Sequence, residues 1–139
     1  MTGRSSGSCH VCCACCLPVL FDLSSPVIPQ ESTLRALQSR GVSRLFRHQA
    51  EAIDAVTAGR HTVVATSTAS GKSLCYNVPV LEALARDPAT CALYMFPTKA
   101  LAQDQLGALR GLVRAAFGGA SGDEGLPSVD IYDGDTPMG

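Results

Sequence analysis

Apolar and polar positions along the chain follow two spacings, and each predicts one kind of element. Short continuous runs of apolar, mostly β-branched or aromatic residues predict strands that are buried on both faces. These runs occupy residues 62–65, 91–96 and 129–132. Apolar residues that recur every three or four positions predict helices with one apolar face. These segments are 32–39, 48–58, 72–85 and 99–117.

The order of these elements predicts the fold class. Strands that alternate with helices form a parallel sheet with right-handed crossovers and helices on both faces. We therefore expect an α/β protein with a three-layer arrangement. Ligands of such sheets lie beyond the carboxyl ends of the strands. Residues 66–73, 97–99 and 133–136 all follow strand ends and are expected to share one rim.

Individual residues mark where the helices begin, end and bend. Ser32 is expected to cap the N-terminus of the first helix, and Gly41 and Gly59 to end the first two helices. Pro79 lies inside the third helical segment and predicts a bend there. The glycine-rich stretch 118–127 predicts a mobile loop ahead of the last strand.

Composition fits one globular core without a strong electrostatic bias. The chain has 139 residues, of which 46% are hydrophobic and 17% charged, and its formal net charge is −1. This balance gives no overall attraction to nucleic acid, so any such contact must be local. No apolar run approaches the roughly 20 residues that a membrane-spanning helix needs.

The first 30 residues differ from the rest of the chain. They hold a single basic residue, Arg4, and an apolar, cysteine-rich stretch at 11–21 that Pro18 interrupts. A targeting peptide would need a small-residue cleavage site, and no convincing one follows. We therefore expect residues 1–30 to be a low-complexity, disordered leader and residues 31–139 to form the folded domain.

Five of the seven cysteines lie in this leader, and their spacing allows a zinc site as an alternative. The candidate ligands are Cys9, His10, Cys12 and Cys15 or Cys16. No second cysteine or histidine pair follows at the distance that a zinc finger needs, which argues against this hypothesis. The other two cysteines, Cys75 and Cys91, lie among apolar residues and are expected to be buried.

Residues 66–73, between the strand 62–65 and the next helix, have the composition of a phosphate-binding loop. Backbone N–H groups and a helix N-terminus would point at one spot, which suits a triphosphate. Lys72 would reach the outer phosphates, and the Ser73 hydroxyl would coordinate Mg²⁺. The general pattern has glycine where this chain has Thr66, so a small-residue turn with an exposed lysine is the alternative.

Four segments in this order resemble motifs of the first RecA-like lobe of superfamily-two DEAD/DEAH-box helicases. Residues 45–49 resemble the Q motif or motif 0, and residues 66–73 resemble motif I. Residues 96–105 resemble motif Ia, and residues 132–137 resemble the glycine-containing segment between motifs Ia and Ib. The resemblance covers residues 33–139 and is greatest to the RecQ-related Hrq/YprA-type helicases, especially plant and algal members.

The resemblance implies ATP and Mg²⁺ as cofactors, with Lys72 and Ser73 as the candidate catalytic residues. Gln49 would pair with the edge of adenine, because its amide both donates and accepts, and Arg47 and Phe46 would pack near the base. The residues expected to bind the nucleotide are Gln49, Arg47, Thr68, Ala69, Ser70, Gly71, Lys72 and Ser73. Two alternatives stay open: Gln49 capping its own helix, and Phe46 lying in the core.

The resemblance also implies DNA as the partner, tracked as a single strand in the 3′-to-5′ direction. The residues expected to contact it are Pro97, Thr98, Lys99, Gln103, Gly134 and Thr136. Thr98 can cap the helix that starts at Lys99, and a basic residue at a helix N-terminus suits a phosphate. A plain helix start with a solvated lysine, and a turn made by Asp133 and Asp135, are the alternatives.

Two parts of the family's catalytic machinery have no counterpart in the 139 residues. These are the acidic Walker B motif, which holds Mg²⁺ and orients the attacking water, and the second lobe with its arginine finger. We therefore expect an incomplete first lobe of a P-loop NTPase, truncated before Walker B, from a nuclear ATP-dependent DNA helicase. The chain alone is expected not to hydrolyse ATP. A non-catalytic remnant that binds nucleotide or nucleic acid, and another P-loop NTPase such as a nucleotide kinase, are the alternatives.

Overall fold

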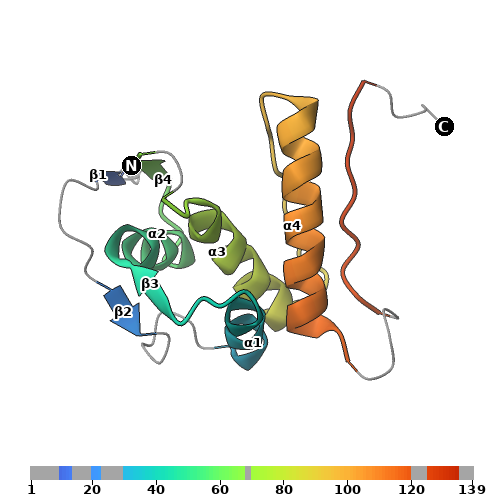
Figure 1. Ribbon diagram of the computed structural model, residues 1–139, viewed down its shortest axis with the longest axis horizontal. Helices are drawn as coiled ribbons and strands as arrows, with labels where there is room; N and C mark the ends of the chain where they lie inside the picture. Colours follow the sequence, from blue (N-terminus) through green and yellow to red (C-terminus); the bar gives the residue numbers. More distant parts are fainter. Residues whose placement is uncertain (1–9, 14–19, 23–29, 68–69, 120–124, 135–139) are drawn as a thin grey trace, which may run out of the picture.

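The computed structural model shows a group of helices with short strands on one side (Figure 1). The described residues are 10–13, 20–22, 30–67, 70–119 and 125–134. In chain order the elements are β1 (His10–Cys13), β2 (Leu20–Asp22), α1 (Glu31–Ser39), β3 (Arg44–Phe46), α2 (Arg47–Thr57), β4 (Thr62–Ala65), α3 (Ser73–Arg86) and α4 (Lys99–Phe117). Figure 1 shows α1, α2 and α3 grouped together, α4 standing beside α3, and the segment 125–134 running along α4 on its far side.

The four helices follow the pattern of apolar positions, and each begins and ends within one residue of its predicted bounds. The prediction of Ser32 as the cap of α1 is wrong. The cap is Gln30, which has extended backbone angles (φ −92°, ψ 124°) and whose carbonyl already accepts from the N–H of Leu34. Gly41 and Gly59 each have a φ of 72°, which lets the chain turn out of α1 and α2 as predicted.

Only the first predicted strand forms a backbone ladder in the described part of the chain. β4 pairs in parallel with β1, with His10 opposite Thr62 and Cys13 opposite Ala65. β2 and β3 form a second, antiparallel pair. The expected burial of β4 on both faces is wrong, because Val63 is 51% exposed. Both β1 and β2 come from the first 30 residues of the chain.

The predicted strands at 91–96 and 129–132 are extended segments without a ladder among the described residues. The prediction of paired strands there is wrong, and this part of the chain does not form the expected three-layer sheet. An apolar run indicates extended backbone, but a strand also needs a neighbour within hydrogen-bonding distance. Cys91, which lies in the first of these segments, is exposed rather than buried, whereas Cys75 in α3 is buried as predicted.

Parts of four sequence predictions lie outside the described residues. These are the zinc-ligand candidates Cys9, Cys15 and Cys16, the nucleotide-binding candidates Thr68 and Ala69, residues 120–124 of the glycine-rich loop, and the DNA-contact candidate Thr136. Among the helices that the structure describes, none is long and apolar enough to cross a membrane.

Two clusters of buried apolar side chains hold the helices together. The first joins α1, β3, α2 and α3 through Leu37, Leu45, Ile53 and Val78. The second joins α1 and α3 to α4 through Ala36, Leu81, Leu112, Val113 and Ala116. Full burial of a valine, leucine or isoleucine side chain contributes about 1.5–3 kcal/mol. Because α1 and α3 belong to both clusters, they connect the region of β4 and α2 to α4.

Two arginines, Arg35 of α1 and Arg40 directly after it, strengthen the contact of α1 with α4. Arg40 Nη2 donates to the carbonyl of Ala108 at 2.6 Å, and Arg35 Nη2 donates to the carbonyl of Ala116 at 3.3 Å. Gly111 allows this close approach, because a Cβ at that position would lie 2.6 Å from Arg40 Nη2. These two arginines therefore bind the backbone of α4 where its side chains are small.

Candidate functional site

A single glycine shapes the loop between β4 and α3. Gly71 has a φ of 72°, in the left-handed region that other residues rarely adopt. A Cβ at this position would also lie 2.6 Å from Nε2 of Gln49. Two residues further on, Ser73 begins α3. The helix N-terminus therefore follows the glycine turn closely, which is the arrangement of an anion-binding loop.

The ammonium group of Lys72 lies against the oxygens of its own loop. Nζ donates to the carbonyls of Thr66 at 3.3 Å and Ser67 at 2.5 Å. It also lies 3.1 Å from Thr66 Oγ1 and 3.3 Å from Ser70 Oγ, and these two hydroxyls are hydrogen-bonded to each other. An ammonium group has three protons to share among these oxygens. The loop thus holds a cation with oxygen atoms, which phosphate oxygens can replace.

Two consecutive residues at the start of α2 hold the end of this loop. Gln49 is 2% exposed; its Oε1 accepts from the N–H of Phe46 at 2.9 Å, and its Nε2 donates to the carbonyl of Gly71 at 2.9 Å. Nε2 of His48 lies 3.1 Å from the carbonyl of Ser70. Gln49 therefore caps its own helix, the alternative that the sequence left open, while it also binds the loop. Its role toward adenine stays a prediction.

Phe46 and His48 form a flat aromatic surface beside the loop. Their rings are stacked, with centroids 5.8 Å apart and planes 9° from parallel. Phe46 is 40% exposed, so it is not a core residue. Arg47, between them, forms an ion pair with Glu51 one turn along α2, with Nε 2.6 Å from Oε1. The sequence pattern does not single out His48; its position directly before Gln49 is the only signal there.

The N-terminus of α4 carries most of the residues predicted to meet DNA. Thr98 caps the helix as predicted, because its Oγ1 accepts from the N–H of Leu101 at 3.3 Å. Lys99 is the first helical residue. The predicted contact residues Pro97, Thr98, Lys99, Gln103 and Gly134 are exposed, whereas Thr136 lies outside the described residues. The start of α4 is therefore accessible to a ligand.

A cleft of about 830 Å³ opens beside this helix start. Its walls are α3, α4 and the segments 88–96 and 127–133. Tyr94 lies in the cleft, and its hydroxyl is buried without a hydrogen-bond partner in the described part of the chain. Burial raises the pKa of Tyr94 to about 12. The neighbouring Leu93 and Met95 are 87% and 85% exposed, so the cleft has an apolar rim.

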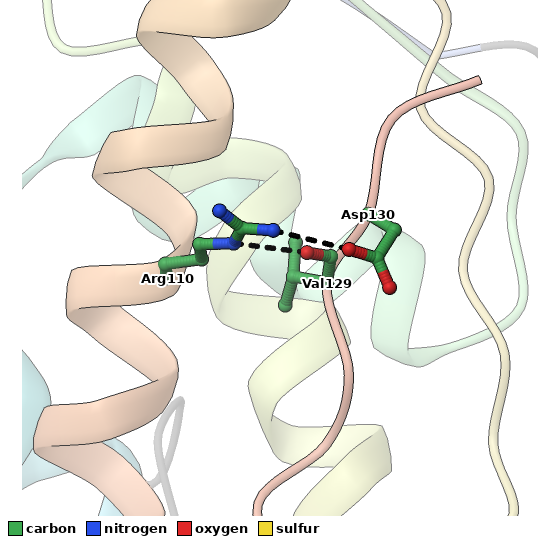
Figure 2. Close-up of polar contacts among 3 residues, drawn as sticks. All are labelled: Arg110, Val129 and Asp130. Atoms are coloured by element: carbon green, nitrogen blue, oxygen red, sulfur yellow. Dashed lines mark hydrogen bonds and ion pairs between the residues drawn. The ribbon is translucent and has the colours of Figure 1, made fainter. Parts of the chain in front are cut away.

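Arg110 of α4 fixes one wall of the cleft. Its Nε donates to the carbonyl of Val129 at 3.0 Å, and its Nη2 donates to Asp130 Oδ1 at 3.1 Å (Figure 2). Toward α3, Gln105 Oε1 accepts from the hydroxyl of Tyr76 at 3.1 Å. Side-chain hydrogen bonds therefore join α4 both to the segment 125–134 and to α3.

A strand, a glycine turn, and a lysine and a hydroxyl at the start of the next helix define the P-loop class of nucleotide-binding proteins. Within that class, the chain belongs to the DEAD/DEAH box helicase family, whose model matches residues 46–132. The matched range begins at Phe46, contains the whole loop, α3 and α4, and reaches Tyr132 in the far wall of the cleft.

Curated relatives confirm the resemblance to Hrq/YprA-type helicases. The uncharacterized ATP-dependent helicase YprA of Bacillus subtilis is 47% identical over 105 residues, which are 73% of this chain and 13% of the relative. The ATP-dependent helicase hrq1 of Schizosaccharomyces pombe is 39% identical over 121 residues, which are 84% of this chain and 10% of the relative. The chain therefore spans about an eighth or less of these relatives.

A solved structure of the helicase MrfA bound to DNA and AMPPNP is similar with a TM-score of 0.72 and 40% sequence identity. The similarity covers 86% of this chain and 16% of that protein. The chain accordingly has a RecA-like P-loop fold, although its described residues form only the β1–β4 parallel ladder of such a sheet.

Proposed function

We propose that this chain provides the ATP-binding and DNA-contacting portion of an ATP-dependent DNA helicase. The observation that carries the proposal is the loop 66–73, which presents Lys72 at the start of α3 and is held by Gln49 of the Q-motif segment. The names of the relatives support ATP-dependent helicase activity, and the similar structure of MrfA contains both DNA and AMPPNP.

In this proposal Lys72 leaves the loop oxygens and binds the outer phosphates of ATP. The Ser73 hydroxyl would hold Mg²⁺, which would neutralise phosphate charge in the intact helicase. The remaining loop residues, Ser70 and Gly71 together with Thr68 and Ala69, which lie outside the described residues, would supply backbone N–H groups. Phe46 and Arg47 lie on the side where the base would pack. The exposed aromatic surface of Phe46 supports this placement.

DNA is proposed to bind along the start of α4 and the adjoining cleft. The exposed position of Lys99 at a helix N-terminus supports a phosphate contact, because the helix dipole and the ammonium group both attract an anion. The other proposed contacts are Pro97, Thr98, Gln103, Gly134 and Thr136. Tracking of a single strand in the 3′-to-5′ direction belongs to the intact helicase.

Catalysis is proposed for the intact helicase and not for the 139-residue chain alone. Hydrolysis in this family needs an acidic Mg²⁺ ligand and an arginine finger in addition to Lys72 and Ser73. We also propose that residues 1–30 are a low-complexity leader, of which the described residues 10–13 and 20–22 pair with β4 and β3, and that the helicase acts in the nucleus. Fluorescence microscopy of the tagged helicase tests the location.

Titration with a fluorescent ATP analogue in the presence of Mg²⁺ tests the proposed function. Lys72→Ala removes a charged donor to the phosphates and is expected to weaken binding about 10- to 100-fold. Arg86→Ala is the matched control, because it removes an exposed positive charge at the opposite end of α3. Equal affinities of the wild-type chain and Lys72→Ala would rule out the assignment of the loop.

A further inference from the structure

Neighbouring residues of α2 hold neighbouring carbonyls of the phosphate-binding loop. Nε2 of His48 lies 3.1 Å from the carbonyl oxygen of Ser70, and Nε2 of Gln49 donates to that of Gly71 at 2.9 Å. A carbonyl oxygen only accepts hydrogen bonds, so the contact to Ser70 requires a hydrogen on Nε2 of His48. The second half of the loop is therefore attached to the first turn of α2 at two successive points.

We infer that His48 is a positioning residue, which holds the phosphate-binding loop in place relative to the surface for the base. This inference rests on the proposed ATP-binding function. It assigns to His48 a role separate from that of Gln49, because the His48 ring joins a loop carbonyl to the aromatic ring of Phe46, whereas Gln49 contacts the backbone of Phe46.

The contacts of His48 and Gln49 hold one part of the loop in place, whereas the side chain of Lys72 must move when ATP binds. Lys72 binds oxygens of Thr66 and Ser67, and these contacts must break before its ammonium group reaches a phosphate. The carbonyls of Ser70 and Gly71 are held from α2, so the start of α3 keeps its position during this change. Holding these backbone groups in advance lowers the cost of ordering them when the phosphates bind.

The ring stack extends the attachment to the base. The ring of His48 lies nearly parallel to that of Phe46, which is partly exposed. A base that packs on Phe46 would restrict the rotation of the His48 ring, and with it the hydrogen bond to Ser70. The geometry therefore couples the two ends of a bound nucleotide through one side chain.

Two substitutions of His48 separate the effect of its hydrogen-bond donor, Nε2, from the effect of its stacked ring. His48→Phe keeps a flat ring for the stack and loses the donor, whereas His48→Gln keeps an amide donor and loses the ring. Affinities of the 139-residue chain for ATP and for inorganic tripolyphosphate, both with Mg²⁺, are measured for each variant. His48→Phe is expected to lower the affinities for both ligands by the same factor, about threefold to tenfold. His48→Gln is expected to keep most of the wild-type affinity for tripolyphosphate.

Phe46→Ala is the matched control, because it should lower the affinity for ATP but leave the affinity for tripolyphosphate unchanged. Wild-type affinity of His48→Phe for both ligands would overturn the inference. Loss of ATP affinity alone would also overturn it, because His48 would then contact the base and not position the loop. A wild-type chain that binds neither ligand would contradict the proposed function itself.

Amide hydrogen exchange without nucleotide tests the attachment independently of ATP binding. His48→Phe is expected to speed exchange at the start of α3 about threefold to tenfold, because one hydrogen bond that restrains this segment is lost. Exchange in α4 should not change. Unchanged exchange at the start of α3 would overturn the inference even if the chain binds ATP.

Discussion

Thr66 stands at the loop position where the general phosphate-loop pattern has glycine, and its side chain binds Lys72. Thr66 Oγ1 lies 3.1 Å from Lys72 Nζ and is hydrogen-bonded to Ser70 Oγ. A phosphate must compete with this hydroxyl for the ammonium group. The departure from the pattern therefore has a physical effect on the binding equilibrium.

Thr66→Ala should strengthen ATP binding, because it removes one internal competitor for Lys72 and leaves the backbone carbonyls in place. An increase in affinity of about twofold to tenfold corresponds to one ordinary hydrogen bond. Titration with the fluorescent ATP analogue measures it. Thr62→Ala on β4 is the control, because its hydroxyl donates to the carbonyl of Arg60 instead. Weaker ATP binding by Thr66→Ala would show that the hydroxyl supports the site.

Spacing along the chain identifies Gly71, Lys72 and Ser73 because the loop is a local structure. Its chemistry depends on residues that follow one another between a strand and a helix. The role of His48 depends on a contact with Ser70, 22 residues away, and no local pattern contains such a pair. Sequence alone also allows two roles for Gln49, because an amide can both cap a helix and pair with the edge of a base.

At the scale of single elements, α3 carries a buried carboxyl group. Glu82 is 1% exposed, and neither carboxyl oxygen has a hydrogen-bond partner in the described part of the chain. A buried polar group without a partner costs about 1–3 kcal/mol. The residue therefore weakens a helix that otherwise supplies Val78 and Leu81 to the core.

Glu82→Met is expected to raise the free energy of unfolding by about 1–3 kcal/mol, because it fills a similar volume without the buried polar oxygens. Glu82→Gln is the control, since it keeps the shape and polar atoms and should change stability little. Urea unfolding of the three chains gives the comparison. A destabilised Glu82→Met would show that the carboxyl group has a favourable role in α3.

Two glycines of α4 provide a matched test of its contact with α1. Gly107→Ala should stabilise the chain by about 1 kcal/mol, because alanine favours a helix and a Cβ there meets nothing within 4 Å. The gain in stability from Gly111→Ala should be smaller than that from Gly107→Ala by about 0.5–1.5 kcal/mol, because its Cβ displaces Arg40 from the carbonyl of Ala108. Thermal unfolding measures both, and equal stabilities would contradict the importance of the Arg40 contact.

The helices follow from the sequence more closely than the strands. The helix 99–117 makes its hydrogen bonds within itself, so its own apolar spacing is enough to locate both ends. The segment 91–96 has a composition typical of a strand, but a ladder depends on a distant neighbour that local pattern does not contain. The same dependence explains why β4 pairs with residues 10–13, which no sequence pattern marked as a strand.

At the scale of the whole molecule, the segment 125–134 is tied to α4 by Arg110. Arg110 and Asp130 are 55% and 79% exposed, so their ion pair alone contributes about 0–1 kcal/mol. The hydrogen bond from Arg110 to the carbonyl of Val129 adds a contact that salt does not screen. Arg110 therefore holds the cleft wall through two different kinds of contact, beside the packing of Val129 against the second core cluster.

Arg110→Ala is expected to speed proteolytic cleavage between residues 125 and 134, because both contacts are lost together. Asp130→Asn removes only the ion pair and should have a smaller effect. Limited proteolysis followed by mass spectrometry measures the two rates. Equal rates for wild type and Arg110→Ala would show that other contacts hold this wall.

The apolar rim of the cleft affects the behaviour of the chain in solution. Leu93, Met95 and Tyr132 are each more than 80% exposed, and the extended segments beside them have no ladder among the described residues. Exposed apolar surface next to unpaired backbone favours association between chains. We expect the isolated chain to self-associate as its concentration rises, which sedimentation velocity can measure.

The two core clusters limit how α3 can move. Val78 belongs to one cluster and Leu81, less than one helical turn away, belongs to the other. Rotation of α3 about its axis would remove one of these side chains from its cluster, and close-packed interiors resist such a change. A small shift along the helix axis would disturb both clusters least. Any displacement of α3 relative to α1 and α4 would therefore be a slide along its axis and not a rotation.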